Sequence, residues 1–138
     1  MWCSDAFKNG VTVTYVNHKL YYYVMRSNSI IHDKFNENRL ELFDVIEYRI
    51  KTLEELKLYQ IYQFEYNKLF FAIIGCYCDA KIAKDKTAIR RIKAVFKKHK
   101  KEIKRYTKLS GKYKALNALM TINFDFINLY YLFGKRAK

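Results

Sequence analysis

Two kinds of hydrophobic spacing divide this chain. Between Val11 and Val16, apolar residues alternate with threonines, which is typical of a half-buried strand, and Leu20 to Met25 resumes a strand-like composition after a short polar connection. The pattern therefore predicts a short β-hairpin and turn within residues 1–35. Because two strands alone are marginally stable in water, other elements are expected to cover them.

From residue 36 onward the apolar residues recur every three or four positions, which is typical of amphipathic helices. The spacing predicts helices over about 37–56, 59–82, 83–109 and 113–133, with a break near Lys57 that neither glycine nor proline marks. The helix over 59–82 is apolar around most of its circumference and should be the most buried. The expected fold is mainly α, with three to four helices following a short N-terminal β-hairpin in a single domain, 1–138, whose helical region is 36–138.

Composition excludes a disordered chain, because 51% of the residues are hydrophobic and 17% are aromatic. The three cysteines, Cys3, Cys76 and Cys78, lack the spacing of common zinc and redox motifs, so we expect reduced, mostly buried thiols and a cytoplasmic protein. The longest apolar run, Leu69 to Cys78, is too short to span a bilayer.

The positive charge is concentrated in one segment. Residues 81–114 hold 15 Lys and Arg against 2 Asp and Glu, while the whole chain has a net charge of +14. On the helix predicted over 83–109 the candidate basic surface consists of Lys93, Lys97, Lys100, Lys101 and Lys104. The charges could form the solvated side of a packed helix, or they could contact an anionic membrane surface. Nucleic acid is the less favoured partner, because only the generic positive charge points to it.

The hairpin and the helix after it resemble the C-terminal part of family 2 glycosyltransferases. Those enzymes read Leu-Tyr-x-Tyr-Arg-x-Arg, then two residues, then Ser-Ile or Ser-Val. The matching residues are Leu20, Tyr21, Tyr23, Arg26, Ser29 and Ile30, and Val24 stands where the family often has its first arginine. The amphipathic segment RLELFDVIEYRIKTLEEL continues the likeness.

The resemblance covers only the non-catalytic end of the family. There, an N-terminal α/β domain binds the nucleotide sugar and a divalent metal (Mg or Mn), and an acidic pair that would fall at or before Met1 supplies the base. The resemblance thus implies a C-terminal segment of an enzyme that transfers a sugar to a cell-surface polysaccharide or lipid-linked acceptor. It also implies a separate transferase domain as partner, no catalytic residue or cofactor in this chain, and no activity of the chain alone.

Within that family the turn after the hairpin lies beside the donor site, which makes Arg26 and Ser29 candidate contacts to the donor diphosphate, with His32 as a third. These roles depend on the transferase domain. The alternative is that Arg26 pairs with a surface carboxylate while Ser29 shapes a turn.

Two further functions remain open. The chain could be a basic helical interaction module that binds an anionic membrane surface or nucleic acid, located in the cytoplasm and peripheral at the inner face of the membrane. It could also be an assembly element, in which a homo-oligomer covers apolar surface.

Overall fold

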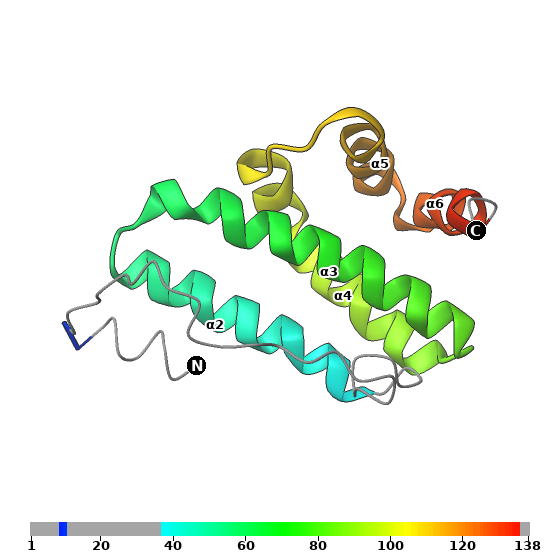
Figure 1. Cartoon of the computed structure of the whole chain (residues 1–138), viewed down its shortest axis with the longest axis horizontal. Coiled ribbons are helices and arrows are strands. Elements are labelled where there is room, and N and C mark those ends of the chain that lie inside the picture. The colour runs from blue at the N-terminus through cyan, green and yellow to red at the C-terminus, as the bar shows by residue number, and fades with distance from the viewer. Residues whose placement is uncertain (1–8, 11–36, 136–138) are drawn as a thin grey trace, which may run out of the picture.

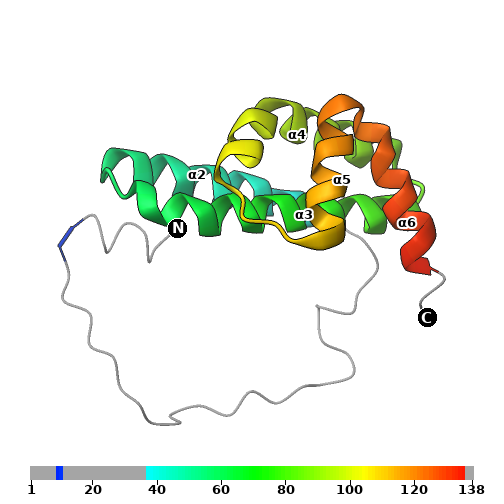
Figure 2. The same cartoon turned by 90° about the horizontal axis from the view of Figure 1, so that it is seen from above.

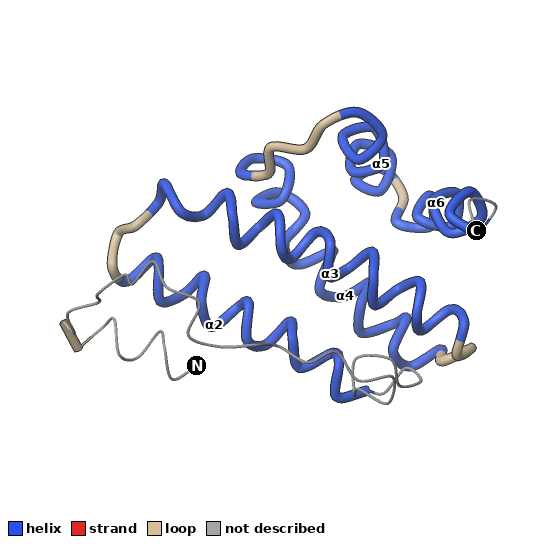
Figure 3. Tube along the Cα trace, viewed as in Figure 1, coloured by secondary structure: helices blue, strands red, loops and turns tan. Residues whose placement is uncertain are grey.

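The computed structural model describes residues 9–10 and 37–135. The predicted hairpin, the motif residues Arg26 and Ser29, and His32 lie outside these described residues. The described part contains five α-helices and no strand (Figures 1 and 3). The α-helices are α2 (Glu41–Glu55), α3 (Tyr62–Ile82), α4 (Lys86–Tyr106), α5 (Gly111–Ile122) and α6 (Ile127–Lys135), with 3-10 turns η2 (Glu37–Leu40), η3 (Tyr59–Ile61) and η4 (Phe124–Phe126).

Helices α2, α3 and α4 run antiparallel in succession and pack as a three-helix bundle (Figure 1). Helices α5 and α6 form an antiparallel pair that lies across α3 and α4 and does not extend along them (Figure 2). The mainly helical prediction is confirmed for the described residues. The expected number of three to four helices is too low.

The most buried helix is α3, as its apolar sequence predicts. Ten of its residues are buried, and Leu69, Phe70 and Ile73 have no exposed surface. Burying one such side chain stabilises the fold by about 1.5–3 kcal/mol. The apolar sides of α2 and α4 also face inward. The core takes Leu40 from η2, Phe43, Ile46 and Ile50 from α2, and Ala88, Ile92, Phe96 and Ile103 from α4. Helix α3 needs apolar residues on most sides, because it packs against α2 and α4 and its side chains also contact residues of α5, η4 and α6.

The two turns between the bundle helices use lysine where glycine is usual. Lys57 and Lys84 have φ angles of 55° and 58°. After each helix the chain closes a Schellman motif, in which the Leu58 N–H donates to the Leu53 carbonyl oxygen and the Asp85 N–H donates to the Ala80 carbonyl oxygen. The break predicted near Lys57 is confirmed. Neither glycine nor proline marks this turn in the sequence, because Lys57, an ordinary L-residue, occupies the left-handed position.

The ends of α4 differ from the predicted range of 83–109. Asp85 is the N-cap, and its carboxylate accepts a hydrogen bond of 2.9 Å from the Ala88 N–H, so the helix begins at Lys86. At the other end Thr107 has an extended backbone, and the helix ends at Tyr106. Residues 107–110 form a linker, and Gly111 is the first residue of α5.

The single helix predicted over 113–133 is wrong. Asn123 has an extended backbone, and its side chain accepts a hydrogen bond of 2.9 Å from the Asp125 N–H, which separates α5 from η4 and α6. The break allows Leu116 and Met120 of α5 and Ile127 of α6 to reach the same core. The helical spacing of apolar residues could not reveal this turn, because the same spacing is compatible with one continuous helix and with two helices separated by a turn.

Candidate functional site

The five lysines predicted to form a basic surface differ in their ion pairs. Lys93 forms an ion pair with Asp125, with 2.6 Å between Nζ and Oδ1, and lies over the Phe124 ring. It therefore links α4 to η4. The other four form no ion pair within the described part of the chain, and we call them the α4 ridge: Lys97, Lys100, Lys101 and Lys104.

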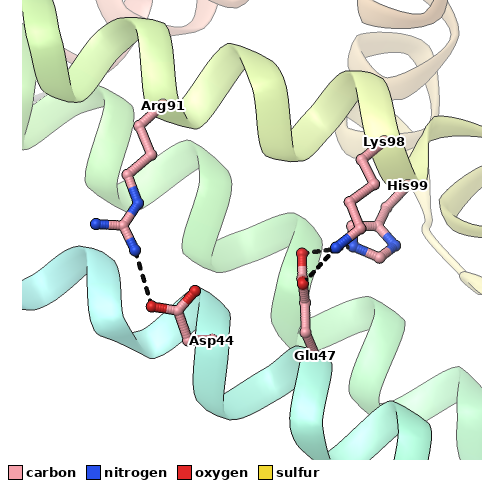
Figure 4. Close-up of polar contacts among 5 residues, drawn as sticks. All are labelled: Asp44, Glu47, Arg91, Lys98 and His99. Carbon is pink, nitrogen blue, oxygen red and sulfur yellow. Dashed lines mark hydrogen bonds and ion pairs between the residues drawn. The ribbon is translucent and has the colours of Figure 1, made fainter.

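The side of α4 that faces α2 is also basic, but its charges are used within the fold (Figure 4). Arg91 pairs with Asp44 at 2.8 Å, and Lys98 pairs with Glu47 at 2.5 Å. His99 Nε2 lies 2.8 Å from the second carboxylate oxygen of Glu47. These pairs join the first and third helices of the bundle and leave their basic side chains with an internal counterion.

Glu47 shows the electrostatic effect of this arrangement. Burial raises the pKa of its carboxyl, but the hydrogen bonds from Lys98 and His99 and their positive charges act in the opposite direction and outweigh it, so the pKa is lowered from its ordinary value. Glu47 is therefore held in its charged form, as a structural ion pair requires.

A hollow of about 630 Å³ lies beside these pairs, between α2 and α4. Its lining includes four carboxylates, Asp44, Glu47, Glu54 and Glu102, and also Lys51, Lys98, His99 and the buried Tyr66. Burial, followed by the charge of Glu102, raises the pKa of the Tyr66 hydroxyl, so this hydroxyl stays protonated. Four acidic groups thus face two lysines and one histidine in the hollow, and Lys98 and His99 already pair with Glu47.

A second hollow, which we call the α4–α5 groove, has a different charge. It has a volume of about 700 Å³ and is lined by the last turns of α4, the linker after it and α5. Its lining residues are Lys104, Thr107, Lys108, Leu109, Lys114, Asn117, Ala118, Thr121 and Ile122. Three of these nine side chains are basic and none is acidic.

Of the predicted lysines, only Lys104 lines this groove. Lys108, Lys114 and Asn117 were not predicted, although both lysines belong to the basic segment 81–114. Helical spacing could not place the three lysines together, because they belong to α4, the linker and α5, and the chain reverses between them.

No group of three His, Cys, Asp or Glu side chains within the described residues could hold a metal ion. Cys76 is buried and Cys78 is half-buried, and both are free thiols whose pKa is raised, by burial first and then by Asp79. Cys3 lies outside the described residues. Of the helices that the structure describes, none combines the length and apolar character needed to cross a membrane.

Comparison of the chain with models of protein families, with curated protein sequences and with solved structures found no match.

Proposed function

We propose that this chain is the C-terminal region of a family 2 glycosyltransferase, which adjoins the domain that transfers a sugar from a nucleotide donor to a polysaccharide or lipid-linked acceptor. The proposal rests on the sequence motif formed by Tyr21, Tyr23, Arg26 and Ser29, which precedes an amphipathic helical segment. In the fold that segment becomes η2 and α2, and its apolar stripe enters the bundle core.

In this proposal the helical bundle supports the end of the transferase domain, and Arg26 and Ser29 contact the donor diphosphate, with His32 beside them. An arginine and a hydroxyl suit a diphosphate because both donate hydrogen bonds to its charged oxygens. The other domain supplies the divalent metal and the catalytic base, since the leaving diphosphate must be neutralised and the acceptor hydroxyl deprotonated.

The proposal is tested first by the genomic sequence upstream of Met1, where an in-frame or adjacent transferase domain is expected. When this domain is joined to the chain, Arg26→Ala should weaken binding of a nucleoside diphosphate in the presence of Mn²⁺ by about tenfold, which corresponds to the loss of one charge-assisted contact. Arg39→Ala is the matched control, because Arg39 pairs with Asp79 at 2.8 Å. In the 138-residue chain alone, Arg26→Ala should leave any binding of the nucleotide unchanged, because the donor site requires the transferase domain. Absence of any transferase domain near the gene would contradict the proposal.

A second candidate function is attachment to an anionic membrane surface through the α4 ridge. The observation that favours it is that Lys97, Lys101 and Lys104 are exposed and form no ion pair within residues 37–135. Lysines near a negatively charged surface contribute about 1 kcal/mol each at physiological salt. Such attachment would suit an enzyme whose acceptor is lipid-linked.

Vesicle sedimentation tests this second function. Binding to phosphatidylglycerol vesicles should fall steeply with salt and disappear when the four ridge lysines are changed to glutamate. The control changes four exposed lysines elsewhere to glutamate, namely Lys51, Lys57, Lys84 and Lys112. Equal losses in the two variants would show a general charge effect. Binding to duplex DNA but not to vesicles would point instead to nucleic acid.

A further inference from the structure

The geometry points to the α4–α5 groove as a binding site for a phosphate group carried by an organic molecule. The groove exists because α5 does not continue α4. Thr107 has an extended backbone, and after a short linker Gly111 adopts a φ of 50° as the chain enters α5. The chain thereby turns back beside the end of α4 and lines an open hollow of about 700 Å³, a size within the range of small-molecule sites.

The charge of the groove is not compensated by the protein. Lys104, Lys108 and Lys114 approach it from α4, the linker and α5, and no carboxylate lies in its lining. None of the three lysines has an ion pair within the described residues, in contrast to Arg91 and Lys98 on the other side of α4. Ammonium groups that share one hollow repel each other, and an anion between them would remove this repulsion.

Asn117 is the second observation that indicates a ligand. Its side chain lines the groove but is only 8% exposed, and its Oδ1 is buried without a hydrogen-bond partner. A buried polar atom without a partner costs about 1–3 kcal/mol. An oxygen atom is an acceptor and would not attract an anion, but the oxygen and nitrogen of an amide are nearly indistinguishable in shape. With the amide turned over, the NH2 group stands at the unpartnered position and can donate to a phosphate oxygen.

The remaining polar groups of the lining define which hydrogen bonds the groove can donate to a ligand. The Thr107 hydroxyl already donates to the Ile103 carbonyl oxygen, and the Thr121 hydroxyl donates to the Asn117 carbonyl oxygen. These hydroxyl protons are therefore unavailable to an anion. The donors left for phosphate oxygens are the three ammonium groups and the Asn117 amide, which suits a doubly charged phosphate group.

The groove also has apolar walls, which favour an organic phosphate over the free ion. Leu109, Ala118 and Ile122 line it, and Ile122 is 81% exposed. An exposed isoleucine beside three lysines can contact a hydrocarbon group while the ammonium groups hold the phosphate. The same chemistry is offered by a soluble phosphate ester and by a phospholipid headgroup. The inference does not depend on the glycosyltransferase proposal, because it uses only residues of the described helices.

The test compares two triple variants of the full chain with equal loss of charge. In the groove variant Lys104, Lys108 and Lys114 are changed to glutamine. In the control variant the same change is made at Lys51, Lys84 and Lys86, which are exposed and belong neither to the groove lining nor to the α4 ridge. Circular dichroism checks that both variants keep their helical content. Inorganic pyrophosphate, titrated by calorimetry, is the soluble probe, and vesicles containing phosphatidic acid are the membrane probe.

One of the two probes should bind, with an affinity that falls about tenfold or more in the groove variant and less than about threefold in the control variant. Asn117→Asp should also weaken binding, because it places a carboxylate in the groove. Binding of pyrophosphate would identify a soluble ester as the ligand class, and binding of vesicles alone would identify a lipid headgroup. Failure of both probes to bind, or equal losses in the two variants, would overturn the inference. DNA binding that is reduced equally in both variants would overturn it as well, since the whole basic surface would then be responsible.

Discussion

Arg49 of α2 and Glu65 of α3 form an ion pair in which Nη2 lies 2.6 Å from Oε1, although the Glu65 side chain is only 2% exposed. Lys68 approaches the same oxygen at 3.2 Å, and the other carboxylate oxygen is buried without a partner. A buried carboxylate is costly unless cations hold it, so this pair constrains how the first two bundle helices meet.

We expect Arg49→Ala to lower the free energy of unfolding by about 2 kcal/mol, because it leaves a buried carboxylate with only Lys68 as a cation. Urea denaturation measures this change. Arg39→Ala is the control, since its pair with Asp79 has a similar length but is more than one-third exposed on both sides, and should cost below about 1 kcal/mol. Equal losses of unfolding free energy in the two variants would show that the burial of Glu65 does not increase the contribution of its ion pair to stability.

The left-handed lysines offer a way to stabilise the protein. Lys57→Gly and Lys84→Gly should each raise the free energy of unfolding by about 0.5–1 kcal/mol, because glycine adopts a positive φ without the steric cost of a Cβ. Alanine at the same positions removes the charge but keeps the Cβ, so the alanine variants should stay near the parent protein. Urea denaturation midpoints of the glycine and alanine variants test this prediction. If alanine raised stability as much as glycine, loss of the lysine charge would be the cause.

The lowered pKa of Glu47 predicts a pH dependence. A carboxyl whose pKa is lower in the folded than in the unfolded state contributes stability above its unfolded pKa, about 4.3 for glutamate, and loses this contribution as the pH falls through the folded value. The stability difference between the parent protein and Glu47→Gln should therefore be full at pH 6 and shrink below about pH 4. Urea titrations between these values test it, with Glu41→Gln as an exposed control on the same helix. A difference that stays constant down to pH 3 would contradict the assignment.

Tyr77 joins the bundle to the helix pair, because its hydroxyl donates a hydrogen bond of 2.5 Å to Asn128 Oδ1 of α6 while its ring is 1% exposed. Tyr77→Phe should cost about 1 kcal/mol and should lower the amide-exchange protection of α6 more than that of α2. Tyr59→Phe is the control, since Tyr59 is exposed. Unchanged protection of α6 would mean that apolar packing alone holds this helix.

The sequence by itself determined the helical class, the approximate ranges of the bundle helices, the dominance of α3 in the core and the concentration of positive charge on α4. These features follow from local spacing, because the period of apolar residues shows which side of a helix avoids water. The bundle core agrees with the predicted apolar stripes, whose members include Phe43, Ile92 and Phe96.

Only the tertiary structure decided which charges have partners and where the chain turns. Lys93 and Lys97 are alike in sequence, yet Lys93 meets Asp125, which is 32 residues away, while Lys97 faces solvent. The turn at Asn123 and the meeting of Lys104, Lys108 and Lys114 in one groove also depend on how α5 returns across α4. The physical reason is that ion pairing and groove formation depend on distances between residues far apart in the chain, which the spacing within a single helix does not contain.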